Sequence, residues 1–379
     1  MTYQTELSLL LSKCENAGAQ LVIPWGGEDL SNPPPRRNLM IVGESLGADE
    51  EREGDYFVGK AGKLFDKLLR DVGLIRTIAH VTNVIKVRPP DNKVERLNEL
   101  NLSLEDFIPL IKEEILCVQP KVILAMGRYA METLTSCEGV LKWRGSTVQL
   151  KPVFGTLDIP VVITLHPSYL ARGQMELFPY VRHDIERFAK TGLGLSTKPK
   201  PTQWTQIIDP TFSQTINFLH DIHENSTETC YDIETIAKQR ITCIGWTKSP
   251  SEVICIPFRH RGLQNRWGEK EQLDIIYAMR KIYEKPRLVK IAQNQHYELH
   301  YLLPLLGFPR EPLFDTMYAH QLIHPDARHD LGFLTSVYTS MPFHKDEAKD
   351  WNQRNLPHDR VLWEYNCKDC ISTHIVTKT

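Results

Sequence analysis

The chain of 379 residues carries 45 lysine and arginine residues against 47 aspartate and glutamate residues, which gives a formal net charge of −2. Because folded domains commonly hold about 100 to 200 residues, this length predicts two domains, each large enough for a core of its own. The balance of charge excludes a globally basic protein, so any surface for nucleic acid is expected to be local.

The N-terminal residues 1–18 predict a short amphipathic helix that lacks the basic segment and the small-residue cleavage site of a signal peptide. No apolar run of about 18 residues follows anywhere in the sequence, so no membrane span is expected. The 8 cysteines are scattered, which is typical of a reducing compartment and not of a disulfide scaffold. We therefore expect a cytoplasmic protein.

Between residues 39 and 167, short β-branched runs alternate with helical stretches. The expected strands are 39–44, 80–87, 121–127 and 160–167. The expected helices are 60–71, 104–117, one beginning at Arg128, and 180–192. Alternation of this kind predicts an α/β domain in which helices flank a parallel sheet and functional residues lie at the carboxyl ends of the strands.

The composition changes after residue 192. The segment "LGLSTKPKPTQW" at 193–204 is rich in Gly, Ser, Pro and Lys and predicts a linker, so the expected domains are 1–192 and 204–379. Beyond it, three β-rich runs predict a meander, at 230–235, 241–248 and 252–258. Helical segments are expected to dominate from Leu273 to the end.

Polar motifs follow the expected strands of the first domain: "GESLG" at 43–47, "TNVIKVRPPDN" at 82–92 and "HPS" at 166–168. Because the carboxyl ends of parallel strands meet at one edge, Glu44, Asn83 and His166 are expected to converge there. With "FVGKAG" at 57–62, these four ordered motifs resemble the uracil-DNA glycosylase superfamily, most closely its bacterial and archaeal family.

The resemblance implies a uracil-DNA glycosylase-like domain that excises uracil by hydrolysis of the N-glycosidic bond. Phe57 would stack on the flipped base and Asn83 would hydrogen-bond to its edge. His166 would donate to the uracil oxygen that gains negative charge, and Glu50 would stabilise positive character on the sugar or position water. The implied substrate-binding residues are Glu44, Phe57, Asn83 and Asn92.

The motifs also depart from that family, whose members hold an iron–sulfur cluster on four cysteines. Here Val87 occupies the position of one ligand, Cys14 is followed by Ala17 where a second cysteine is expected, and another ligand position falls near Phe107. We therefore expect no iron–sulfur cluster. Leu46 replaces the usual proline of the first motif, which loosens the constraint on φ in that turn.

The second domain carries a different set of acidic residues. The segment "YDIET" places Asp232 and Glu234 two positions apart on an expected strand, hence on one face. The segment "YNCKD" places Tyr365 and Asp369 four positions apart on an expected helix, again on one face. Unpaired carboxylates among apolar neighbours would be costly to bury, and a bound metal ion would remove that cost.

These segments, with "NQHYELHYL" at 294–302, resemble in order the three motifs of the tyrosine-bearing DEDD 3′-to-5′ exonucleases, the proofreading domains of family A DNA polymerases. Residues 314–334 match their DT and R-H-D-L elements. The resemblance implies a ribonuclease H-like mixed sheet, with Tyr365 orienting the attacking water and Asn294 binding substrate. The implied metal ligands are Asp232, Glu234, Glu298 and Asp369, of which Glu298 stands where the family has aspartate.

Such a site would hold two Mg²⁺ or Mn²⁺ ions about 4 Å apart, which stabilise the attacking and leaving oxygens of a phosphodiester. The expected partners are single-stranded DNA 3′ ends, uracil-containing DNA, and a DNA polymerase domain that follows in the chain or is separate. An alternative stays open, in which the first domain is a non-catalytic DNA-binding or protein-interaction module and only the exonuclease is active.

Overall fold

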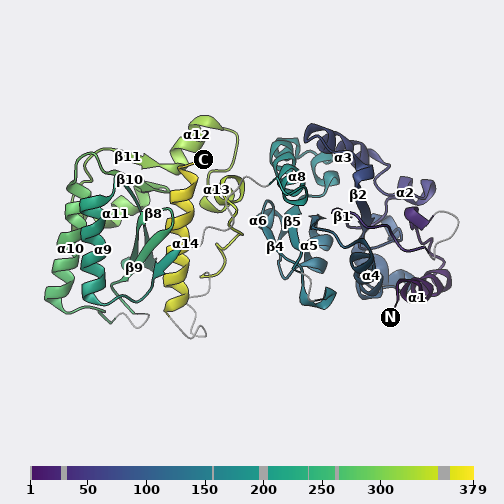
Figure 1. Cartoon of the computed structure of the whole chain (residues 1–379), viewed down its shortest axis with the longest axis horizontal. Coiled ribbons are helices and arrows are strands. Elements are labelled where there is room, and N and C mark those ends of the chain that lie inside the picture. Colours follow the sequence, from purple (N-terminus) through teal and green to yellow (C-terminus); the bar gives the residue numbers. More distant parts are fainter. Residues whose placement is uncertain are drawn as a thin grey trace. The chain divides into compact units, whose positions relative to one another are not determined.

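The computed structural model describes residues 2–26, 32–155, 158–195, 204–237, 239–260, 264–348 and 359–379. The chain forms two compact units, Met1–Thr197 and Lys198–Thr379, and each contains a sheet flanked by helices (Figure 1). Most of the predicted linker, residues 196–203, lies outside the described residues.

The first unit is built on a five-stranded sheet in the order β2-β1-β3-β5-β4. Its strands are β1 (Leu39–Gly43), β2 (Ala79–Asn83), β3 (Val122–Met126), β4 (Thr147–Gln149) and β5 (Pro160–Thr164). The four longer strands run parallel, which confirms the expected sheet. The antiparallel edge strand β4 was not expected, because three residues carry too little periodicity to predict a strand.

Helices cover both faces of this sheet because its strands are apolar on both sides. On β1, Met40 and Val42 pack with α1 (Tyr3–Asn16) and α4 (Ile108–Val118), whereas Leu39 and Ile41 pack with the other helix layer. That layer contains α3 (Lys60–Asp71) and α8 (Phe178–Gly192). The shorter helices are α2 (Ala48–Glu53), α5 (Arg128–Leu134), α6 (Val140–Trp143) and α7 (Pro167–Ala171). The described 3₁₀ turns of this unit are Pro24–Gly26, Arg76–Ile78, Pro90–Asn92, Val94–Leu100, Leu104–Asp106, Pro152–Phe154 and Met175–Leu177.

The second unit contains a six-stranded mixed sheet in the order β11-β10-β7-β8-β9-β6. Its strands are β6 (Thr205–Ile207), β7 (Glu228–Ile236), β8 (Arg240–Ser249), β9 (Glu252–Pro257), β10 (Val289–Ala292) and β11 (Leu313–Asp315). The antiparallel meander β7-β8-β9 is the one that the sequence predicted. The short strands β6, β10 and β11, which pair in parallel with β9, β7 and β10, were not expected.

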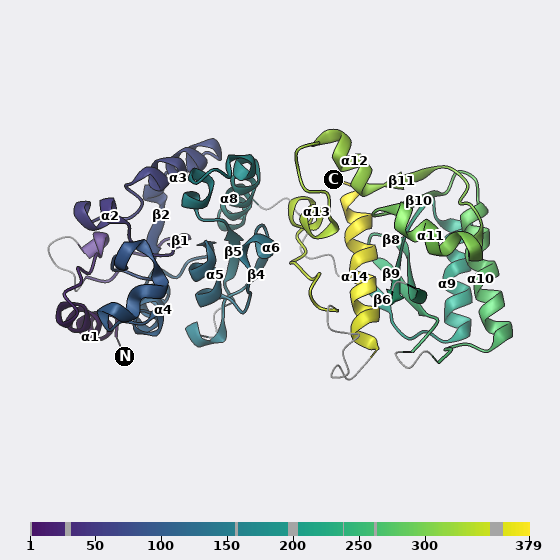
Figure 2. The same cartoon turned by 180° about the vertical axis from the view of Figure 1, so that it is seen from behind.

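The faces of this sheet differ in what covers them. Ile233 and Ile244 pack with α9 (Phe212–Asn225) and α10 (Glu269–Glu284), whereas Cys243 packs against α14 (Arg360–Val376). The remaining helices are α11 (Gln295–Leu306), α12 (Thr316–Ile323) and α13 (Leu331–Tyr338). Seen from behind, the sheet again separates α9 and α10 from α14 (Figure 2). Among the described residues, no helix has the length and apolarity needed to span a membrane.

Two candidate active sites

At the carboxyl edge of the first sheet, the missing side chain of Gly43 lets two other residues approach. Gly43 of β1 is in register with Asn83 of β2. A Cβ on Gly43 would lie 2.3 Å from Asn83 Oδ1 and 2.5 Å from Cζ of Phe57, so only glycine fits there. Asn83 is 2% exposed, and its Oδ1 has no hydrogen-bond partner among the described residues. A buried amide oxygen without a partner is costly unless a ligand satisfies it.

His166 lies beside Phe57, with the two rings stacked at 5.7 Å between centroids. It caps the N-terminus of α7, where its Nδ1 accepts a hydrogen bond of 3.2 Å from the backbone N–H of Ser168. Burial lowers the pKa of His166, which favours the neutral ring. Because Nδ1 accepts, the proton of the neutral ring is on Nε2, and His166 is a hydrogen-bond donor at that atom. We call Gly43, Phe57, Asn83 and His166 the strand-end cluster.

Glu44 follows Gly43 at the same edge of the sheet. Its Oε1 accepts a hydrogen bond of 3.1 Å from the backbone N–H of Tyr129, in the first turn of α5. Gly127, which precedes this helix with φ of 91°, leaves room for the carboxylate. Glu44 therefore closes a helix N-terminus, and its negative charge acts against the burial that lowers the pKa of His166.

Glu50 uses both carboxylate oxygens on the backbone. Oε2 accepts from the N–H of Gly47 and Oε1 accepts from the N–H of Gly59, each at 3.1 Å. These two glycines precede α2 and α3, so Glu50 holds the two helix starts together. The acidic segment is thus a short helix, and Glu50 has a structural function in addition to the chemistry predicted for it.

Asn92 ends the 3₁₀ turn Pro90–Asn92. It is exposed, and its Oδ1 accepts a hydrogen bond of 2.9 Å from Nε of Arg88. Arg88 also pairs with Glu51 of α2 at 3.2 Å. Within the described ranges, no hydrogen bond or ring contact joins Asn92 to Asn83, Phe57 or His166.

The positions that correspond to iron–sulfur ligands lie in one apolar core. Cys14, Val87 and Phe107 are all fully buried there, and Ala17 packs against them. Cys117 also packs against this core, so the described thiols there are those of Cys14 and Cys117. Four thiolates are needed to hold such a cluster, so the residues present do not fit it.

In the second unit, Asp232, Glu234 and Asp369 bring carboxylate oxygens within 4.8 Å of one another. Asp232 and Glu234 lie two apart on β7, and Asp369 comes from the middle of α14, which packs on that face. We call these three residues the acidic cluster. Oxygen ligands of this kind bind hard divalent cations such as Mg²⁺, Mn²⁺ or Ca²⁺.

The acidic cluster is poorly compensated without a cation. Burial, followed by the charge of Asp369, raises the pKa of Asp232 to about 7, and burial also raises the pKa of Glu234 well above its ordinary value. Glu298 of α11 is 3% exposed, and burial followed by the charge of Asp232 raises its pKa to about 9. A bound cation would stabilise these groups in their charged form.

Basic and amide groups that sequence analysis missed hold the acidic cluster. His344 Nε2 lies 2.9 Å from Oδ1 of Asp369, and Lys345 Nζ lies 2.5 Å from Oδ2. Asn366 Nδ2 donates to Oδ2 of Asp232 at 2.8 Å. Asn366 is the second residue of the "YNCKD" segment, so its position could have pointed to it. The segment that contains His344 and Lys345 carries no periodic signal.

Tyr365 and Asn294, the other two residues predicted for this site, differ in their contacts. Tyr365 is 9% exposed, one helical turn before Asp369, and its ring lies 4.8 Å from Lys345 Nζ. Asn294 precedes α11 with a φ of 60°, and its backbone N–H donates to Asp315 Oδ1 at 3.1 Å. No described contact of the Asn294 side chain reaches the acidic cluster.

Comparisons with known proteins agree with these geometries. The family model of the uracil DNA glycosylase superfamily matches residues 30–188, and that of a 3′-5′ exonuclease matches residues 215–379. The two units together define a hydrolase that acts on nucleic acids.

A type-4 uracil-DNA glycosylase of Sulfurisphaera tokodaii is 33% identical over 172 residues, which cover 44% of this chain and 73% of that protein. A DNA polymerase of Bacillus phage SP01 is 22% identical in an alignment 381 positions long, which covers 89% of this chain but only 40% of the polymerase. Escherichia coli RNase D, described as an exoribonuclease, aligns with a TM-score of 0.35 at 17% identity, over 46% of this chain and 43% of its own. The chain belongs to the uracil-DNA glycosylase superfamily, with type-4 glycosylases as relatives, and carries a 3′-5′ exonuclease domain as its second unit.

Proposed function

We propose that this protein processes DNA at two sites, by excising uracil at the strand-end cluster and by removing nucleotides from single-stranded 3′ ends at the acidic cluster. The observation that carries the proposal is the convergence of Asp232, Glu234 and Asp369 in the second unit of a chain whose first unit has glycosylase motifs at its strand ends. Similarity to a phage polymerase favours a protein that acts together with a DNA polymerase domain, either in the same chain or in a separate one.

At the acidic cluster, we assign Asp232, Glu234 and Asp369 as direct ligands of two Mg²⁺ or Mn²⁺ ions. Glu298 binds a cation directly or through water. When bound, the cations supply Lewis-acid stabilisation of the attacking and leaving oxygens. Tyr365, which lies one helical turn before Asp369, orients the attacking water. His344 and Lys345 lie within hydrogen-bond distance of the two oxygens of Asp369, one on each oxygen.

At the strand-end cluster, the chemistry follows from the donors and acceptors that the fold leaves available. Phe57 supplies the stacking face for a flipped base, and the Asn83 amide pairs with the base edge, which satisfies its buried oxygen. Bond cleavage leaves negative charge on the uracil ring, and the Nε2–H of His166 donates to the oxygen that carries it. The carboxylates of Glu44 and Glu50 add negative charge near the sugar, where positive character develops.

A second candidate function keeps the first unit as a binding module without chemistry. It is favoured by Glu50, whose two oxygens already accept from Gly47 and Gly59, and by Leu46 in place of proline. Two observations favour catalysis: His166 Nδ1 accepts a hydrogen bond, which leaves the proton on Nε2, and Asn83 Oδ1 has no partner among the described residues.

One assay separates these possibilities. Uracil-containing oligonucleotides labelled at the 5′ or the 3′ end are incubated with the protein, with and without EDTA. A 3′-to-5′ ladder that EDTA abolishes, and that is lost in Asp232→Ala and Asp369→Ala, supports the exonuclease; a ladder that persists in both variants overturns it. An alkali-labile site that survives EDTA supports glycosylase chemistry, and its absence at high protein concentration favours the binding module.

A further inference from the structure

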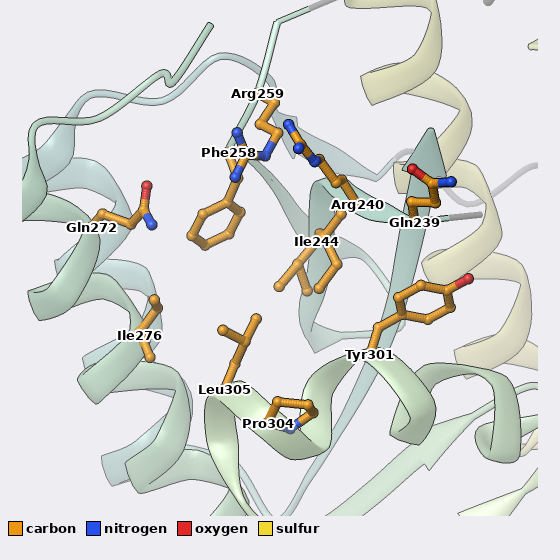
Figure 3. Close-up of a pocket in the computed structure, with 11 residues that line it drawn as sticks. Gln239, Arg240, Ile244, Phe258, Arg259, Gln272, Ile276, Tyr301, Pro304 and Leu305 are labelled. Atoms are coloured by element: carbon orange, nitrogen blue, oxygen red, sulfur yellow. The ribbon is translucent and has the colours of Figure 1, made fainter. Parts of the chain in front are cut away.

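A pocket of about 260 Å³ opens on the face of the second sheet opposite the acidic cluster. Ile244 of β8 lines it and is in register with Ile233, the residue between Asp232 and Glu234, so it points away from their carboxylates. Figure 3 shows an apolar floor of Ile244, Phe258 and Leu305. Arg240 and Arg259 occupy one end of the pocket. We call this cavity the arginine pocket.

The two arginines of this pocket lack acidic partners. Arg259 donates to the neutral Oδ1 of Asn265 at 3.0 Å, and neither Arg240 nor Arg259 forms an ion pair with any residue that the structure describes. Each guanidinium offers five N–H donors in a planar fork that matches the oxygens of a phosphate. Two uncompensated cations at one end of a pocket attract an anion and repel each other without one.

Hydrogen bonds connect the arginine pocket to the acidic cluster through Thr242. The hydroxyl of Thr242 donates to the carbonyl oxygen of Glu234 at 2.8 Å. Its own carbonyl oxygen accepts from the backbone N–H groups of Phe258 and Arg259, at 2.8 and 3.1 Å. Glu234 pairs with Cys243 and Cys243 pairs with Pro257, so two strand spacings, about 10 Å, separate the backbone of Glu234 from that of Pro257.

Two tyrosine rings of α11 extend between these sites. Tyr297, next to Glu298, is 36% exposed and its hydroxyl lies 2.8 Å from Oγ1 of Thr235, adjacent to Glu234. Tyr301, one turn further along, lines the arginine pocket, and the two ring centroids are 5.2 Å apart. Tyr301 is half-buried. Proteins bind single strands with aromatic rings near basic side chains, because bases stack on the rings and phosphates pair with the cations.

We propose that the arginine pocket binds one nucleotide unit of a DNA single strand whose 3′ end lies at the acidic cluster, with the base on Phe258 and the phosphate between Arg240 and Arg259. The inference rests on the proposed exonuclease function. The volume lies just below the roughly 300–1,000 Å³ of sites for drug-sized ligands, which suits a single ring with one phosphate. A free nucleoside monophosphate has the same chemistry, so the test includes it.

The test compares wild type with Arg240→Gln, Arg259→Gln and the double variant. Affinity for a fluorescent ten-residue oligothymidylate is measured by anisotropy in EDTA over a series of NaCl concentrations, and thymidine monophosphate is titrated by calorimetry. Loss of one phosphate contact is expected to reduce the slope of log K against log salt by about 0.7. We expect affinity for the oligonucleotide to fall about tenfold in the double variant, which is a common effect of losing one charged contact.

The matched control is Arg280→Gln, because Arg280 is exposed on α10 of the same unit and pairs with Glu284 at 2.7 Å. If only the oligonucleotide responds to the arginines, the pocket binds the strand; if only the monophosphate responds, it binds a free nucleotide and the strand assignment is wrong. If neither responds, the inference is overturned. If the double variant folds poorly, the two single variants are compared with wild type instead. Each is then expected to show a smaller loss of affinity for the oligonucleotide.

Binding in EDTA does not require cleavage, so this result is independent of the exonuclease assay. If binding depends on the arginines but no nucleotides are removed, the inference about the arginine pocket is supported and the proposed exonuclease function is wrong. If a cleavage ladder forms but binding does not depend on the arginines, the exonuclease function is supported and the inference about the arginine pocket is wrong. In Asp232→Ala, cleavage is expected to disappear while the effect of the arginines on binding persists.

Discussion

Replacing Lys345 by methionine is expected to tighten the binding of Mn²⁺ to the acidic cluster by about 30-fold. The ammonium of Lys345 lies 2.5 Å from Oδ2 of Asp369, whose other oxygen lies 2.9 Å from His344 Nε2. A cation bound to that carboxylate at the usual distance of about 2.1 Å lies within roughly 5 Å of the ammonium. Lys345 therefore repels the cation that the other residues attract.

The magnitude follows from this separation. Two unit charges 4 Å apart interact by about 4 kcal/mol at an effective dielectric constant of about 20, and a divalent ion doubles this value. The side chain of Lys345 is 30% exposed, so salt screens the repulsion and the ammonium can move away from the cation. We expect about 2 kcal/mol to remain, which corresponds to the 30-fold change stated above.

The assay is electron paramagnetic resonance of free Mn²⁺ titrated into DNA-free protein, so it does not depend on turnover. Lys368→Met is the matched control, because Lys368 is adjacent to Asp369 in sequence but pairs with Glu347. An unchanged or weaker affinity in Lys345→Met would refute the electrostatic argument. A thermal melt of each metal-free variant checks that the fold is retained.

Five further outcomes are expected. Because Asp232 has a pKa raised to about 7 by burial and by Asp369, Mn²⁺ must displace a proton, so affinity should rise with pH up to about 7; constant affinity over this range would contradict the assignment. The same shift contributes stability to the metal-free protein below pH of about 4 that is lost as pH rises through about 7, since the folded state holds the extra proton. His166→Ala should slow formation of alkali-labile sites about 100-fold with EDTA present, and an unchanged rate would exclude His166 as the donor. Glu298→Asp should retain the 3′-to-5′ ladder, because the charge is kept and the arm shortens by one methylene; loss of the ladder would show that this site needs the longer arm. The purified protein should be colourless and metal analysis should find no stoichiometric iron, whereas about four irons per chain would show that other cysteines serve as ligands.

The sequence by itself predicted the strands that are long and apolar and the motifs that follow them. The run at β1 and its parallel neighbours were predicted because strands buried on both faces have a continuous apolar signal. Asp232 and Glu234 were predicted to share a face because side chains alternate along a strand, and Tyr365 and Asp369 because they are one helical turn apart. Local periodicity carries all of this information.

Tertiary structure decided which partners these groups have. The short strands β4, β6, β10 and β11 form because neighbouring strands supply their hydrogen bonds, not because their own residues are periodic. In the same way, Glu50 is held by two glycine N–H groups, and Asn83 Oδ1 is left without a partner, only once the strand ends and helix starts come together.

The same is true of the cations in the second unit. Lys345 lies 24 residues before Asp369. Arg240 begins β8 and Arg259 follows the end of β9, so no local pattern predicts that both line one pocket. The sequence determines the type and charge of each group, because these are properties of single residues. Pairing, burial and the resulting pKa values depend on distances through space, and these distances are fixed only when the chain folds.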